Sequence, residues 1–250
     1  MKITILGCGT STGVPMVGCD CRVCTSTDPR DNRTRASILI ETSGSHILVD
    51  TAPDLRLQAL REKIPRIDAV LFTHTHADHV NGIDDLRGFY LTNRQTVPCF
   101  GSRETIEALC RKHSYIFTGA QNGAYAPLLE PHAVSGHFNL LGLRIVPVPL
   151  THGYSRSTGY RIGGTAYLTD CSAIPDTSLE LLENLDVLIM DGLRYKPHPS
   201  HFNIEGALQA VSQLKPRRAI LTHLTHEVAY SEGSRLPDGA EFAFDGMVIE

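Results

Sequence analysis

Residues 71–80 read LFTHTHADHV, an apolar run that passes directly into a cluster of histidine and aspartate. The cluster consists of His74, His76, Asp78 and His79. His74 and His76 are two positions apart, so in extended backbone both side chains point to the same face. Asp78 and His79 are expected at the turn into a helix that begins near Val80, where they face the same cavity from another side. Burying so many polar groups without a metal would be costly, so the stretch predicts a metal site.

The composition is that of a soluble globular protein with one large core. The chain has 250 residues, of which 42% are hydrophobic and 20% are charged. Its net charge of −4 provides no basic field of the kind that drives nucleic-acid binding. No apolar stretch approaches the roughly 20 residues that a membrane span needs, and the apolar run in the opening MKITILGCGT is too short for a secretory signal. Seven cysteines, an odd number, favour a reducing compartment, so we expect a cytoplasmic protein.

Short apolar runs alternate with helix-like segments, which favours a single mixed α/β domain over residues 1–250. Strands are expected at residues 3–6, 38–41, 46–49, 69–72, 97–100, 143–148, 158–162, 166–168, 187–190, 219–221 and 247–249. The second and third strands are joined by Ser43-Gly44-Ser45, which is a hairpin signal. Helical periodicity is clearest at residues 103–112, 177–185 and 204–214, the last with Asn203 as its expected N-cap.

Four of the apolar runs end alike, in threonine followed by histidine or aspartate. Their final residues are His74, His152, Asp170 and His223. In open α/β sheets functional groups gather at the carboxyl ends of the strands, so these side chains are expected to converge on one pocket. With the rest of the first cluster they make seven candidate ligands, His74, His76, Asp78, His79, His152, Asp170 and His223. Imidazole and carboxylate suit zinc, manganese or iron. One tetrahedral ion needs about four ligands, so seven predict two ions, with Asp170 as the bridge.

A second cluster of ligand-type residues lies near the amino end. The glycine-rich loop Gly7–Pro15 follows the first strand and leads into a C-x-C-x-x-C run, Cys19, Cys21 and Cys24. Three thiolates so close together need a fourth ligand to complete a closed tetrahedral zinc site. His226, in the later segment THLTH, is the candidate. The alternative is that these are free cysteines in a loop.

The motif H-T-H-A-D-H at residues 74–79, followed in order by His152, Asp170 and His223, resembles the metallo-β-lactamase superfamily. The resemblance covers nearly the whole chain and implies an αββα sandwich with a dinuclear site at one edge. It implies that His74, His76, His152 and Asp170 hold one ion, and that Asp78, His79, Asp170 and His223 hold the other. The di-iron flavoprotein branch carries glutamate where this chain has His76, so a hydrolytic zinc or manganese site is favoured.

The amino-terminal features are similar to those of the phosphoribosyl cyclic phosphate phosphodiesterase (PhnP) family of bacterial phosphonate breakdown. In that family a C-x-C-x-x-C run and a later histidine hold a structural zinc, which corresponds here to Cys19, Cys21, Cys24 and His226. The family's general acid lies just before a helix, where this chain has His201, with His198 as a competitor. Residues 88–131 and the loop around Tyr195 match less well and are expected to shape the substrate pocket.

The implied function is metal-assisted hydrolysis of a cyclic phosphodiester, phosphoribosyl 1,2-cyclic phosphate or a similar one. A hydroxide held by two zinc or manganese ions would attack phosphorus, and a third, structural zinc would be held by the cysteine loop. His201 would supply a proton to the leaving alkoxide, while Asp78 would orient the nucleophile as well as bind metal. Arg87 is either a phosphate contact or a solvated surface residue, and Asp191 is a candidate hydrogen-bond partner of a ligand histidine.

Three other functions stay open. A tRNA 3′-processing endonuclease of the same superfamily shares the motif and the glycine-rich start. Such enzymes usually carry a long flexible arm that binds tRNA, and this sequence has neither an obvious arm nor an excess of basic residues. A thioester or lactone hydrolase leaves the cysteine cluster unexplained. A non-catalytic metal-binding module would more often have lost part of the ligand set. The expected partners are a small phosphodiester and a second copy of the chain in a homodimer, with neither membrane nor nucleic acid.

Overall fold

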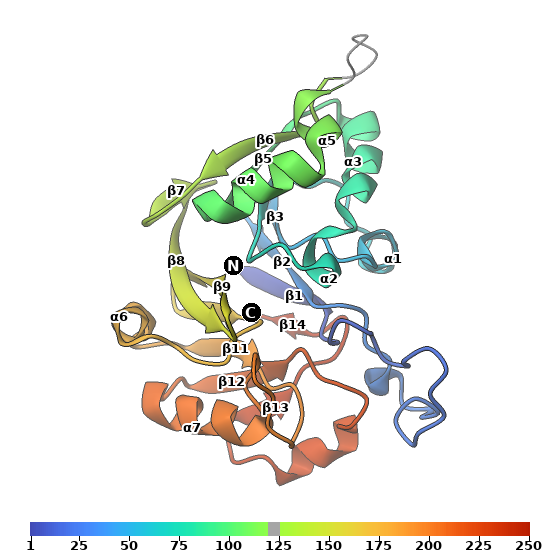
Figure 1. Cartoon of the computed structure of the whole chain (residues 1–250), viewed down its shortest axis with the longest axis vertical. Helices are drawn as coiled ribbons and strands as arrows, with labels where there is room; N and C mark the ends of the chain where they lie inside the picture. Colours follow the sequence, from blue (N-terminus) through green and yellow to red (C-terminus); the bar gives the residue numbers. More distant parts are fainter. Residues whose placement is uncertain (120–125) are drawn as a thin grey trace.

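The computed structural model describes residues 1–119 and 126–250, in which two β-sheets pack face to face with helices on both outer sides (Figure 1). One apolar layer lies between the sheets and includes Ile38, Ile145 and Ile220. A second layer, including Leu39, packs the first sheet against helices. A third, including Leu221, does the same for the second sheet. The predicted αββα sandwich is therefore confirmed.

The first sheet is built mainly from the amino-terminal half of the chain. Its strand order in the described residues is β14-β1-β2-β3-β4-β5-β6. The strands are β14 (Val248–Ile249), β1 (Lys2–Gly7), β2 (Ser37–Thr42), β3 (Ser45–Val49), β4 (Ala69–Leu71), β5 (Val97–Gly101) and β6 (Leu129–Ala133). Both faces of β2 are buried, since Ile38 and Ile40 face the second sheet while Leu39 faces the helices. The predicted hairpin joins β2 to β3 through Ser43 and Gly44, both with positive φ.

The second sheet comes from the carboxyl-terminal half. Within the part of the chain that the structure describes, its order is β13-β12-β11-β10-β9-β8-β7. The strands are β13 (Ala240–Phe242), β12 (Arg218–Thr222), β11 (Val187–Asp191), β10 (Thr165–Leu168), β9 (Ser155–Ile162), β8 (Leu143–His152) and β7 (Phe138–Leu140). β10, β11 and β12 are parallel, with Leu168 opposite Met190 and Met190 opposite Leu221. Residues that follow these strands therefore emerge at one edge of the sheet.

Helices cover the outer face of each sheet (Figure 1). The α-helices are α1 (Leu55–Arg61), α2 (Ala77–Val80), α3 (Leu86–Asn93), α4 (Arg103–Lys112), α5 (Ser114–Thr118), α6 (Asp176–Leu179) and α7 (Ile204–Leu214). Short 3₁₀ turns are η1 (Pro29–Asp31), η2 (Ile83–Asp85), η3 (Glu180–Leu182) and η4 (Tyr230–Arg235). The predicted bounds of α4 and α7 are confirmed, and the side chains of Ser102 and Asn203 cap them. No described helix is long and apolar enough to cross a membrane.

Some predicted bounds are wrong. β8 continues to His152 and β9 begins at Ser155, because these two residues still pair across the hairpin. The helix expected at residues 177–185 is only α6 followed by a 3₁₀ turn. Asp78 and His79 lie inside α2 rather than ahead of a helix. Of the segment 88–131 that was expected to shape the substrate pocket, residues 120–125 lie outside the described residues.

The two sheets are joined by hydrogen bonds where β4 ends. The backbone N–H of Thr158 donates to the carbonyl of Thr73 at 2.9 Å. The hydroxyl of Tyr160 donates to the carbonyl of Phe72 at 2.7 Å. Both donors belong to β9 of the second sheet, and both acceptors directly follow β4 of the first. The first histidine of the motif, His74, is the next residue, so the ligand cluster begins at the junction of the two sheets.

Candidate metal centre

All seven predicted ligands lie together at the shared edge of the two sheets. One cluster consists of His74, His76, His152 and Asp170, and a second consists of Asp78, His79, Asp170 and His223. Within each cluster the candidate ligand atoms lie within 4.8 Å of one another. All of these side chains except that of His76 are buried. The structure thus brings together the two sets that the sequence predicted, each of the size that one ion needs.

Asp170 stands between the two clusters. Its Oδ2 lies 3.6 Å from Nε2 of both His74 and His152. Its Oδ1 lies 2.9 Å from Nε2 of His79 and 3.3 Å from Nε2 of His223. Each carboxylate oxygen therefore faces a different cluster, which is the arrangement that a bridging ligand requires.

The donor atoms fit a pair of divalent ions. Nε2 of His74, His79 and His223 is buried and forms no hydrogen bond in the described residues. An unpaired buried polar atom is costly, but a lone pair on a metal is satisfied. Two ligands on one tetrahedral ion lie about 3.4 Å apart, close to the separation of 3.6 Å between Nε2 of His223 and Oδ2 of Asp78. The clusters are therefore suited to hold metal.

Outer hydrogen bonds turn the imidazole rings toward the clusters. Nδ1 of His79 donates to Oδ2 of Asp50 at 2.7 Å, and Nδ1 of His152 donates to the carbonyl of Ser200 at 2.7 Å. In both rings this leaves Nε2 as the free ligand atom. Asp50 also accepts hydrogen bonds from the backbone N–H and hydroxyl of Thr73. The sequence reading missed Asp50, although it follows the apolar strand at residues 46–49 just as the ligands follow theirs.

The two clusters differ in their electrostatics. Burial lowers the pKa of His74 well below its usual value and also lowers the pKa of His152, so both rings are neutral ligands. Burial also acts against charge on His223, but the carboxylate of Asp170 outweighs it and raises the pKa of His223 to about 9. The pKa of His79 is raised in the same way, by Asp170 and Asp50 against burial. A divalent ion can supply the positive charge that these protons otherwise provide beside Asp170.

His201 lies beside the two clusters. Its Nδ1 donates to Oδ2 of Asp191 at 2.7 Å, so the other nitrogen is directed to the centre, 4.0 Å from Oδ2 of Asp170. Asp191 had been expected to contact a ligand histidine, and its Oδ1 lies 3.8 Å from Nδ1 of His223. The competitor His198 is one ring further out, 5.1 Å from His201 between ring centroids. The geometry favours His201 over His198.

Three of the residues in and around the centre have a left-handed backbone. The φ angle is 64° at Asp50, 51° at Asp170 and 59° at His223. Non-glycine residues seldom adopt this conformation, which costs about 1–3 kcal/mol and is concentrated at functional sites. Asp50 and His223 directly follow a strand, and Asp170 follows β10 after one intervening residue, so the sharp backbone turn directs each side chain inward at the sheet edge.

Other predicted contacts lie outside the clusters. Arg87 is on α3 and lines a separate cavity with Leu60 and Phe89. A cavity of about 390 Å³ adjoins His74 and is lined by Thr105 and Arg156 among others. Thr105 belongs to the segment that was expected to shape the substrate pocket, whereas Arg156 had not been singled out.

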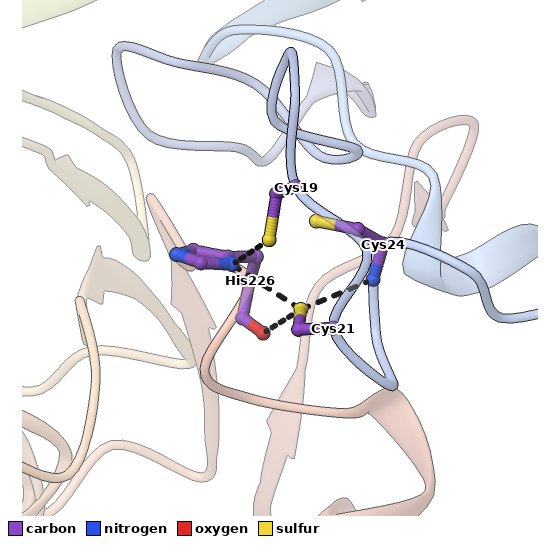
Figure 2. Close-up of side chains that lie close together, drawn as sticks. All are labelled: Cys19, Cys21, Cys24 and His226. Atoms are coloured by element: carbon purple, nitrogen blue, oxygen red, sulfur yellow. Dashed lines mark hydrogen bonds between the residues drawn. The ribbon is translucent and has the colours of Figure 1, made fainter.

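The cysteine cluster is assembled as predicted (Figure 2). The ligand atoms of Cys19, Cys21, Cys24 and His226 lie within 4.8 Å of one another. Nδ1 of His226 lies 3.3 Å from both Sγ of Cys19 and Sγ of Cys21. Hydrogen bonds from the backbone N–H of Cys24 and from His226 lower the pKa of Cys21 to about 6, which favours its thiolate. The donor set fits a closed zinc site that ties the amino-terminal loop to the segment after β12.

Known proteins resemble the chain over its full length. A crystal structure of a diphosphatase from the PhnP family has a TM-score of 0.92 and 41% identity, covering 100% of this chain and 97% of that one. Zinc-bound PqqB from Methylobacterium extorquens has a TM-score of 0.80 at 20% identity over 100% of both chains, which shows the shared fold alone. An octanoyltransferase of Porphyromonas gingivalis is 39% identical over 99% of this chain. The chain spans 51% of the length of that relative.

The family model described as a beta-lactamase superfamily domain matches residues 45–224. That range includes both His/Asp clusters. The likeness to the PhnP-family structure covers the whole chain and therefore also includes the cysteine loop. The chain therefore belongs to the metallo-β-lactamase superfamily of hydrolases and, within it, to the PhnP family.

Proposed function

We propose that this protein is a metal-dependent phosphodiesterase whose substrates are small diesters, cyclic phosphodiesters such as phosphoribosyl 1,2-cyclic phosphate first among them. The observation that carries the proposal is the position of Asp170. Each of its carboxylate oxygens faces a different ligand cluster, and Nε2 of His201 lies 4.0 Å from its Oδ2. Two divalent zinc or manganese ions, held by the seven His and Asp ligands, would activate water and offset the charge on the phosphoryl oxygens.

The chain's own residues supply the proton transfers. Oδ2 of Asp191 accepts a hydrogen bond from the Nδ1–H of His201, which orients the ring so that a proton on Nε2 would point toward the substrate. As the P–O bond breaks, the leaving oxygen takes that proton and phosphorus gains the oxygen of water, while the proton that the water loses passes to solvent and restores His201. Asp78, which is buried beside His79 and His223, would orient the attacking water.

A second candidate is cleavage of a diphosphate, favoured by the full-length likeness to a PhnP-family diphosphatase. Both reactions break a P–O bond at a phosphorus that carries a second substituent. They differ in the leaving group, because an alkoxide requires a proton more strongly than a phosphate does. The two are therefore separated by how strongly turnover depends on His201.

We further propose that Cys19, Cys21, Cys24 and His226 hold a structural zinc. Three thiolates and an imidazole fill a tetrahedral shell and leave no position open for substrate. The site would hold the loop that lies next to the segment Leu224–His226, since Thr10 donates its N–H to the carbonyl of Leu224 at 3.2 Å.

The test is a substrate panel with zinc- or manganese-loaded protein. The panel contains a sugar cyclic phosphate, a linear diester, a diphosphate diester, a phosphate monoester, a thioester and a tRNA precursor. We expect turnover of the diesters, loss of it on chelation and recovery when the metal is restored. Full activity after both ions are removed, or turnover of the thioester or tRNA alone, would overturn the proposal.

A further inference from the structure

A cavity of about 230 Å³ is lined by His201 and is separate from the cavity that His74 lines. Its lining includes the glycine-rich loop at Ser11 and Thr12, together with Arg194, His198 and Glu227. In an in-line displacement the leaving oxygen departs opposite the attacking one, and His201 must reach it to protonate it. The leaving group therefore lies on the His201 side, where this cavity is.

We propose that this cavity is the leaving-group subsite and that it selects a leaving group with an anionic substituent, anchored by Arg194. The inference rests on the proposed function and adds the chemical class of the leaving group. It also gives a role to the glycine-rich loop. Packing accounts for its first glycine, because a Cβ at Gly7 would clash with the carbonyl oxygen of Arg35.

Hydrogen-bond donors predominate around this cavity. Nε of Arg194 is buried and has no hydrogen-bond partner within the described residues. Nδ1 of His198 accepts the backbone N–H of Ser200 at 3.3 Å, so the neutral ring carries its hydrogen on Nε2 as a second donor. The backbone N–H groups of Ser11 and Thr12 donate to no other described residue. An anionic group would accept from such donors, and hydrogen bonds to charged groups are the stronger kind.

Glu227 is the opposing charge and makes the proposal testable. Its Oε1 accepts from Nη1 of Arg194 at 2.8 Å, and the two side chains are 34% and 28% exposed. An anionic substituent would share the guanidinium with Glu227. Removing the negative charge of Glu227 should therefore favour an anionic leaving group, whereas removing the positive charge of Arg194 should disfavour it.

The experiment compares methyl 3-carboxy-4-nitrophenyl phosphate with its carboxylic methyl ester. Both release a nitrophenolate and methyl phosphate, and they differ in one charge on the leaving group. We expect the parent enzyme to have the higher kcat/KM for the carboxylate. In Arg194→Gln the ratio of the two kcat/KM values should fall about tenfold or more, as for a lost charge-assisted hydrogen bond. In Glu227→Gln the ratio should rise.

A matched control and a binding measurement complete the test. Arg217→Gln removes an arginine that pairs with Asp186 at 3.3 Å. Arg217 directly precedes β12, at the end of the strand opposite to His223, so this variant should leave the ratio unchanged. Calorimetric titration with the product 5-hydroxy-2-nitrobenzoate should show weaker binding to Arg194→Gln. An equal loss on both substrates, or a preference of the parent for the ester, would overturn the subsite. Failure of the parent enzyme to hydrolyse either diester would instead count against the proposed function.

Discussion

Asp170 concentrates the chemistry of the centre in one buried side chain. Burial opposes its ionisation, but His223 and the other imidazoles around it hold its pKa well below the usual range. Its two oxygens face different clusters at 2.9 to 3.6 Å. A neutral amide of the same shape would keep the packing and lose the shared anion.

Asp170→Asn should therefore impair both ion sites. We expect at least one ion per chain to be lost and turnover of a diester to fall more than about 100-fold, beyond the 10–100-fold cost of losing an outer hydrogen-bond partner of a ligand. Metal content measured by mass spectrometry after gel filtration, together with kcat, checks this. Asp176→Asn, on the exposed side of α6, is the control. A variant with two tightly held ions and parental kcat would contradict the bridge.

His201→Ala tests the proton donor. On a diester with an alkyl leaving group we expect kcat to fall by about 10²–10⁴-fold, the range for general acid catalysis. On a nitrophenyl diester the loss should be much smaller, because nitrophenolate departs without a proton. Steady-state kinetics on the matched pair gives the contrast. Equal losses on both substrates would count against this role, and His198→Ala would then be the next variant to measure.

At the level of single residues the candidate ligands were predictable, and so was Asp191, but the hydrogen-bond partners Asp50 and Ser200 were not. Each candidate ligand lies in an apolar strand, shortly after one, or on the short helix α2 that follows β4, and that pattern is local in sequence. Asp50 shows the limit, because its meaning depends on His79, which is 29 residues away. The same holds for Ser200, whose carbonyl orients His152 across 48 residues. Only the folded chain places these hydrogen-bond partners.

Among the elements, those with regular periodicity were predictable and those that depart from it were missed. α4 and α7 have capping residues and clear apolar faces. α1 reverses the usual pattern, since Gln58 is buried while Leu57 and Leu60 are exposed. The amide of Gln58 donates to the hydroxyl of Thr34 and to the carbonyl of Arg35, which explains why a polar residue faces inward. β6 contains Pro131 and lies at a sheet edge, where proline is tolerated.

The cysteine loop gives a prediction at the scale of one element. Cys21→Ser should yield a protein with one fewer tightly held zinc and a lower melting temperature, because the loop loses its tie to the segment after β12. Each kcal/mol lost should lower the midpoint by about 2–4 °C for a chain of this size. Zinc analysis and calorimetry measure both effects.

Cys110→Ser is the matched control, since Cys110 is half-buried on α4 and belongs to none of the ligand clusters. It should keep the parental zinc content. Should Cys21→Ser retain all its zinc and melt like the parent, the four residues do not share an ion.

For the whole molecule, the centre joins two sheets that come from different halves of the chain. His74, His76, Asp78 and His79 follow β4 of the first sheet or lie on α2. His152, Asp170 and His223 come from strands of the second sheet or directly follow them. Each cluster combines ligands from both halves. Bound metal would therefore act as a cross-link between the sheets, in addition to its role in catalysis.

Chelation should consequently loosen the edge of the sandwich before it unfolds the core. An ion that binds the folded state alone, at about 1,000 times its Kd, adds about 4 kcal/mol to the free energy of unfolding. At about 2–4 °C per kcal/mol, its removal should lower the melting temperature by about 8–16 °C. Hydrogen exchange should rise at the ends of β4, β10 and β12, while amides of the buried β2 stay protected. Cys21→Ser, treated in parallel, separates the loss of the loop zinc from the loss of the two central ions. Unchanged exchange at those strand ends in protein stripped of both central ions would mean that the hydrogen bonds from β9 to Phe72 and Thr73 hold the sheets together without metal.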